Sequence, residues 1–138
     1  MSSINPHLLV CLFSSSSVIM SVNLYFLLLI LESQEQVLAN LANFAYDPLN
    51  YSYLREVKVV ELFINSLQSR NPYFVEYSIK GICNLCNDPL NHQIIFQNNG
   101  LHFIKELTKS DNPDLVKNAI TVLIYLHPAA NPSGKQGL

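Results

Sequence analysis

The stretch DPLN at residues 47–50 returns 41 residues further on as DPLN at residues 88–91. The same offset brings SRNP at residues 69–72 back as SDNP at residues 110–113, and the two copies align without a gap. Self-similarity at a fixed period of this length is typical of stacked helical repeats. Such repeats bury their apolar faces on each other and expose a long surface, which usually holds partners. The period therefore predicts a binding protein.

The composition narrows the class of protein. The chain has 138 residues, enough for one small domain, and a formal net charge of -2 with no run of Lys or Arg. Because phosphate contacts need clustered positive charge, we expect no direct binding to nucleic acid. Three cysteines argue against a disulfide framework and fit a reducing compartment.

Residues 1–33 differ from the rest of the chain. Residues 8–13 and 18–31 are largely apolar, and no charged residue precedes Glu32. A signal peptide needs a positively charged start and a small-residue cleavage site, and neither is present. A membrane span needs about 20 apolar residues, and residues 18–31 fall short of that length. Three interpretations stay open: a cleaved signal, a membrane anchor, and a helix that caps the stack or a non-native start.

Each period divides into three predicted helices. The first begins at the Asp-Pro pairs of residues 47–48 and 88–89, where Asp caps the helix and proline suits its first position. The second helix follows, and Gly100 is predicted to form the corner before it with a positive φ. Since the preceding copy has Val59 at that place, its corner is predicted to be built differently.

The third helix has the clearest pattern. An Asn-Pro pair starts it at residues 71–72 and again at residues 112–113. Apolar residues then follow at helical spacing, namely Val75, Ile79, Ile82 and Cys86 in one copy and Val116, Ile120 and Leu123 in the next. One more third helix precedes the first full unit, at about residues 34–46. The prediction is an all-α chain of about two and a third repeats.

The ends of the third helices resemble the armadillo repeat, a three-helix unit whose last helix closes with A-L-x-N-L. Residues 41–44 read LANF and residues 82–85 read ICNL, whereas residues 123–126 read LIYL and lack the Asn. The resemblance covers about residues 34–128 and implies a short right-handed armadillo solenoid that acts as a non-catalytic scaffold for protein–protein interactions. Residues 129–138 are predicted to be a flexible tail.

Residues 35–48 (EQVLANLANFAYDP) and 81–87 (GICNLCN) are similar to one member of this family. That resemblance implies a nuclear protein of pre-mRNA splicing, which joins the spliceosome, chiefly the minor one, through a partner with an RNA-recognition motif. Residues 1–33 have no counterpart in that member. The chain stops at Leu138, where that member continues with further helices.

The 41-residue offset places equivalent positions of the third helices side by side. Within one helix Gln36, Asn40 and Asn43 share a face that is predicted to point away from the core. In the armadillo family this face lines a concave groove whose asparagines hold an extended peptide, and a side-chain amide carries both the donor and the acceptor this needs. In the alternative interpretation, Asn43 and Asn84 only set the repeat geometry, and both readings stay open. The predicted groove residues are Gln36, Asn40, Asn43, Tyr77, Lys80, Asn84, Asn118, Thr121 and Tyr125.

The sequence contains no catalytic pattern. Cys83 and Cys86 form a single CxxC with no His at ligand spacing, and they align with Ala42 and Ala45. We therefore interpret both cysteines as helix-packing residues, and we expect no enzyme activity, no cofactor and no metal. The alternative function is a membrane-tethered armadillo adaptor anchored by residues 18–31.

A stack of two units plus one helix is near the lower limit for a self-supporting solenoid. The outer helices, at residues 34–46 and 113–127, are each predicted to leave apolar surface exposed. Residues 34–138 are therefore predicted to be marginally stable and to be stabilised by a partner.

Overall fold

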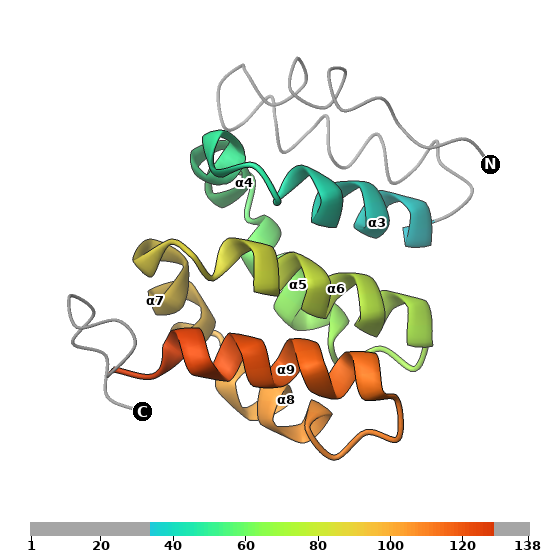
Figure 1. Ribbon diagram of the computed structural model, residues 1–138. Helices are drawn as coiled ribbons and strands as arrows, with labels where there is room; N and C mark the ends of the chain where they lie inside the picture. The colour runs from blue at the N-terminus through green and yellow to red at the C-terminus, as the bar shows by residue number, and fades with distance from the viewer. Residues whose placement is uncertain (1–33, 129–138) are drawn as a thin grey trace.

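A computed structural model describes residues 34–128 of the chain. Throughout this range the regular elements are helical, which confirms the predicted all-α armadillo-type solenoid (Figure 1). The segment at residues 1–33 and the tail at residues 129–138 lie outside the described residues. The elements are α3 (Gln34–Phe44), a 3-10 turn η1 (Pro48–Asn50), α4 (Tyr51–Glu56), α5 (Val59–Ser66), α6 (Pro72–Leu85), α7 (Pro89–Gln97), α8 (Gly100–Leu107) and α9 (Pro113–Leu126).

The three third helices, α3, α6 and α9, form one layer of the molecule. In Figure 1 they run side by side, with α5 and α8 behind them and with α4 and α7 at one edge. Helix α6 packs against both α3 and α9, so it is the central helix of the layer. The second helices α5 and α8 pack on α6 and α9 from the other side. This arrangement leaves one face of the third-helix layer free of the other described helices.

The predicted caps are present at the starts of the helices. Asp47, Asn71, Asp88 and Asn112 have extended backbones, and each side chain accepts a hydrogen bond of 3.0 Å from the N–H two residues later. A proline follows each cap at the first helical position, where its missing N–H costs nothing. The paired caps explain why α6 and α9 start at equivalent residues. The first helices differ slightly, because the first unit begins with the 3-10 turn η1 at Pro48 before α4 starts at Tyr51, whereas α7 starts directly at Pro89.

The last residue of the DPLN motif also has a structural role, which the sequence did not reveal. Asn50 donates from Nδ2 to the carbonyl of Phe44 at 2.9 Å, and Asn91 donates from Nδ2 to the carbonyl of Leu85 at 2.8 Å. Both bonds satisfy a carbonyl near the end of the preceding third helix, which has no partner within its own helix. The motif therefore ties each unit to the helix that comes before it.

The corner between the first and second helices differs from the prediction. The positive φ falls on Lys58 (61°) and Asn99 (60°), one residue before Val59 and Gly100, and no described glycine has a positive φ. Both copies therefore use the same left-handed residue, and the prediction of two different corners is wrong. Gly100 is required for space, because a Cβ there would lie 2.8 Å from Cγ2 of Ile95 and 2.9 Å from its carbonyl oxygen.

The core lies between the third-helix layer and the second helices α5 and α8. Phe63, Leu54, Ile79, Ile82 and Ile104 are fully buried there. These residues come from α4, α5, α6 and α8. Each belongs to the apolar stripe that the sequence predicts for its helix. Burial of these side chains is the main force that holds the units together.

The two ends of the stack differ from each other. On α9 the outward residues Ile120 and Ile124 are 45% and 59% exposed, as predicted for a terminal helix. On α3 the side chains of Val37, Leu38 and Phe44 are buried and belong to the same core cluster. In the predicted range 34–46 the exposed large apolar residue is Tyr46, at 78%, just after the end of α3.

No helix within residues 34–128 is both long enough and apolar enough to cross a bilayer. The candidate anchor at residues 18–31 falls outside this range.

Candidate functional site

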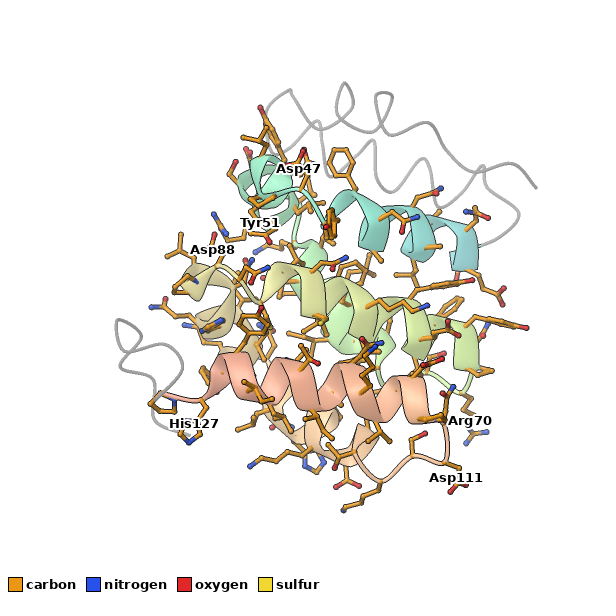
Figure 2. All side chains as sticks on the ribbon, viewed as in Figure 1. Asp47, Tyr51, Arg70, Asp88, Asp111 and His127 are labelled. Carbon is orange, nitrogen blue, oxygen red and sulfur yellow. The ribbon has the colours of Figure 1, made fainter. Side chains whose placement is uncertain are left out.

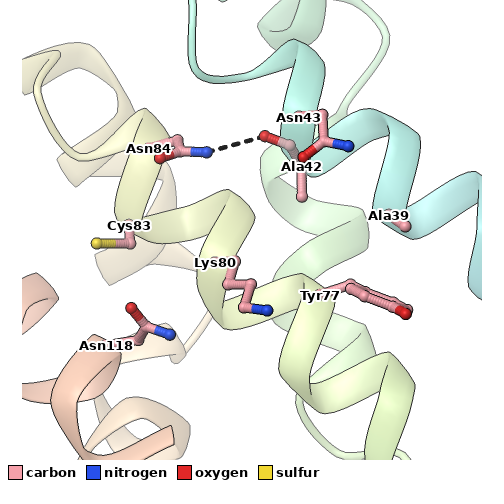
Figure 3. A pocket seen from close by; sticks show the side chains of 8 residues that line it. All are labelled: Ala39, Ala42, Asn43, Tyr77, Lys80, Cys83, Asn84 and Asn118. Atoms are coloured by element: carbon pink, nitrogen blue, oxygen red, sulfur yellow. Dashed lines mark hydrogen bonds between the residues drawn. The ribbon is translucent and has the colours of Figure 1, made fainter. Parts of the chain in front are cut away.

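A groove of about 280 Å³ runs across the free face of the third-helix layer. Its walls are Ala39, Ala42 and Asn43 on α3, Tyr77, Lys80, Cys83 and Asn84 on α6, and Asn118 on α9 (Figure 3). Helix α6 lies between the two other third helices and supplies four of the eight lining residues. Small side chains at Ala39, Ala42 and Cys83 leave the space that the polar groups surround.

Five of the nine predicted groove residues line this groove: Asn43, Tyr77, Lys80, Asn84 and Asn118. The other four do not line it. Gln36 is half-buried and donates from Nε2 to Oδ1 of Asn40 at 3.3 Å. Thr121 turns its hydroxyl back to the carbonyl of Lys117 at 2.8 Å, and Tyr125 is 40% exposed near the end of α9.

Asn40 is the residue whose predicted place is wrong. Its side chain is only 6% exposed, so it does not lie on the polar face that the spacing of Gln36, Asn40 and Asn43 predicts. It occupies the position on α3 that Gly81 occupies on α6, and Gly81 touches the ring of Phe63 in the core. The helix is thus rotated so that this position faces inward, and the Nδ2 atom of Asn40 is buried without a hydrogen-bond partner.

The charge in the groove comes from one lysine. The ammonium of Lys80 forms an ion pair of 2.7 Å with Glu76 and lies 5.9 Å from the centre of the Tyr77 ring. Tyr77 in turn stacks on Tyr73, with ring centres 6.4 Å apart. These contacts hold the lysine over the middle helix of the groove, where it can donate to a carbonyl or carboxylate of a ligand.

The amide of Asn84 is already in use. Its Nδ2 donates to the carbonyl of Ala42 at 2.9 Å, which links α6 to α3 (Figure 3). The side-chain amides of Asn43 and Asn118 have no hydrogen-bond partner among the residues that the structure describes. Of the three asparagines that line the groove, Asn84 therefore has its side-chain amide bonded within the protein, whereas Asn43 and Asn118 do not within the described residues.

The two cysteines of the CxxC have separate environments. Cys86 is buried in the core, and burial, reinforced by the nearby Cys83, raises the pKa of its thiol. Cys83 lines the groove, and partial burial raises the pKa of its thiol as well. Both are free thiols. Within residues 34–128 no group of three His, Cys, Asp or Glu side chains could hold a metal ion.

The predicted set of groove residues omitted Ala39 and also the pair Ala42 and Cys83. Ala42 and Cys83 stand at equivalent positions of α3 and α6 under the 41-residue offset, and their alignment was interpreted only as helix packing. A small residue at the same place in two successive third helices was the signal that could have placed them on the groove.

Comparison with known proteins supports the repeat assignment. The segment that matches is 54% identical over 52 residues to armadillo repeat-containing protein 7 of Mus musculus. The chain is similar to an armadillo-repeat protein. The match covers 38% of this chain and 26% of the mouse protein, so it spans about a quarter of that relative's length. No protein-family model matches the chain.

A solved structure shows the same arrangement of helices. The crystal structure of an engineered protein superposes with a TM-score of 0.70 and covers 94% of this chain and 55% of its own. Its sequence identity of 18% is low, so the likeness concerns the fold alone.

Proposed function

We propose that this chain is a protein-interaction scaffold, and that the groove across α3, α6 and α9 binds an extended segment of a partner protein. The observation that carries the proposal is the convergence of Asn43, Lys80 and Asn118 from three successive third helices on one groove. A side-chain amide offers a donor and an acceptor to a peptide group, and the ammonium offers donors. The similarity to an armadillo-repeat protein and the repeat fold support a role in binding rather than catalysis.

The finer form of the proposal concerns the partner. We propose a nuclear role in pre-mRNA splicing, in the spliceosome and chiefly the minor one, through a partner that carries an RNA-recognition motif. This rests on the resemblance of residues 35–48 and 81–87 to a splicing-associated armadillo protein. The net charge of -2 supports contact with RNA through the partner rather than directly.

Affinity purification with mass spectrometry tests both forms of the proposal. The tagged chain is compared with a variant that carries Asn43→Ala and Asn118→Ala, in nuclear extract treated with ribonuclease. We expect the variant to lose one co-purifying protein, because it lacks two groove amides. Asn65→Ala on α5 is the matched control, since Asn65 is exposed and lies outside the groove.

The outcomes separate the two forms. An unchanged list of proteins for the groove variant would contradict the groove. Loss of a protein that has no RNA-recognition motif and no link to splicing would contradict the splicing role and leave the scaffold in place.

A further inference from the structure

We infer that Asn84 is a clasp between α6 and α3, and that a partner is recognised by Asn43 and Asn118 at the two walls of the groove, with Lys80 between them. This inference rests on the proposed function for its binding part only. It divides three groove asparagines, which the sequence could not tell apart, into one positioning residue and two binding residues.

The clasp is a chain of two hydrogen bonds that joins three helices. The Tyr51 hydroxyl on α4 donates to the backbone carbonyl of Asn84 at 2.6 Å, and the Asn84 side chain donates to the carbonyl of Ala42 on α3 at 2.9 Å. Tyr51 is buried, and its bond to Asn84 is partly buried. Carbonyls near the end of a helix need partners from outside the helix, and Ala42 is two residues before Phe44, the last residue of α3.

The clasp sets the shape of the groove because it acts across it. Ala42 and Asn84 both line the groove, one on α3 and the other on α6. Their bond therefore limits how far the two helices can move apart. If the Asn84 amide bound a ligand instead, its hydrogen bond to Ala42 would break. The Ala42 carbonyl would then lose its side-chain donor, which costs free energy.

Asn43 and Asn118 are available to a ligand. Asn43 is exposed and Asn118 is half-exposed, and neither side-chain amide is bonded within the described residues. They lie on α3 and α9, with α6 between them. Packed helices are about 10 Å apart, so the axes of α3 and α9 are separated by roughly 20 Å. At about 3.3 Å per residue, an extended segment of roughly six residues would span them.

The first experiment uses the free chain and needs no partner. Thermal unfolding of the full chain is measured for Asn84→Ala, Asn84→Asp, Asn43→Ala and Asn118→Ala. We expect Asn84→Ala to lower Tm by roughly 4–8 °C, the shift expected for loss of one hydrogen bond in a domain of this size. Asn84→Asp should not rescue it, because the carboxylate has no donor for the Ala42 carbonyl. Asn43→Ala and Asn118→Ala should not lower Tm, because neither amide is bonded within the described residues and Ala is the better helix former.

Hydrogen exchange gives the readout that a general loss of stability would not reproduce. Asn84→Ala should speed amide exchange in α3 more than in α9, because only α3 loses its clasp. Equal acceleration in both helices, or an unchanged Tm, would overturn the clasp.

The binding part is tested with a phage-displayed library of random 12-residue peptides, selected on the immobilised full chain. We expect Asn43→Ala and Asn118→Ala each to weaken a selected peptide about five- to tenfold, the effect of one lost hydrogen bond. Peptides cut below six residues should lose the contribution of one of the two asparagines. If Asn84→Ala abolished binding without changing Tm or exchange, Asn84 would be a direct contact and the inference would be wrong. If no peptide were selected, the proposed groove function would fail, whereas the clasp would still be decided by Tm and exchange.

Discussion

Gly81 is a point of close approach between α6 and α5. A Cβ built there would lie 2.3 Å from Cε2 and 2.4 Å from Cζ of Phe63, and the Phe63 ring is fully buried. We predict that Gly81→Ala lowers the free energy of unfolding by about 1–3 kcal/mol, because overpacking a rigid core displaces the ring or the helix. Urea denaturation of the full chain measures the change.

The neighbouring residue provides the control for this prediction. Lys80→Ala changes an exposed side chain in the same turn of α6 and should shift stability by less than about 0.5 kcal/mol. Adding Phe63→Leu to Gly81→Ala should cost less than the sum of the two single changes, since it removes the ring that the new methyl meets. Strict additivity would show that Gly81 and Phe63 do not compete for this space.

At the scale of elements, the first helices of the two units are joined by an ion pair. Arg55 on α4 donates from Nη1 to Oδ2 of Asp88 at 2.6 Å and to Oδ1 of Asn91 at 3.2 Å. The position of Asp88 is labelled in Figure 2. Asp88 is also the cap of α7, whereas Asp47 caps η1 without an ion pair. The two aspartates therefore have the same capping role and differ in the ion pair, so comparing their variants isolates its contribution to stability.

We predict that Asp88→Ala is more destabilising than Asp47→Ala. Both variants lose a cap worth about 1 kcal/mol, and Asp88→Ala also loses a partly buried ion pair worth about 1 kcal/mol more. Chemical denaturation of the two variants measures the difference. Equal losses would mean that the Arg55–Asp88 pair contributes nothing to the stacking of the units.

The corners before α5 and α8 lead to a prediction of increased stability. Lys58 and Asn99 have left-handed backbones, which cost free energy for a residue with a Cβ. We predict that Lys58→Gly stabilises the chain by about 0.5–1 kcal/mol, and that Asn99→Gly gains less because Asn tolerates this conformation better.

Thermal unfolding of the two corner variants checks this order. Gly100→Ala is the control, and it should destabilise, because its Cβ would meet both the side chain and the carbonyl of Ile95. A loss of stability in Lys58→Gly would show that the Lys58 side chain contributes more than its backbone costs.

At the scale of the whole molecule, the described stack ends in an uncovered apolar face on α9. Ile120 and Ile124 are exposed on it, and Val116 and Leu123 are half-buried beside them. We predict that the isolated chain associates as its concentration rises, because exposed apolar patches favour association. Ile120→Lys together with Ile124→Lys should reduce that association without lowering Tm.

Sedimentation velocity over a range of concentrations measures this effect. Ile82→Lys is the contrasting variant, since Ile82 is fully buried and a charge there should unfold the chain. Unchanged association of the double variant would show that another surface is responsible.

The sequence by itself determined the all-α class, the three third helices and the four capped starts at Asp47, Asn71, Asp88 and Asn112. These features depend on local sequence alone, because a cap, a proline and an apolar stripe lie within a few residues of each other. Such signals keep their meaning wherever the helix is placed, and they repeat with the 41-residue period.

Only the tertiary structure decided how equivalent residues differ. Ile79 and Ile120 occupy the same repeat position, yet Ile79 is fully buried and Ile120 is 45% exposed, because within the described residues a further unit packs on α6 but none packs on α9. Asn43 and Asn84 are also equivalent, yet only Asn84 has a carbonyl of a preceding third helix within reach among the described residues. Burial and hydrogen bonding depend on neighbours that are 41 residues or more away in the chain, and these neighbours decide which polar side chains remain available to a partner.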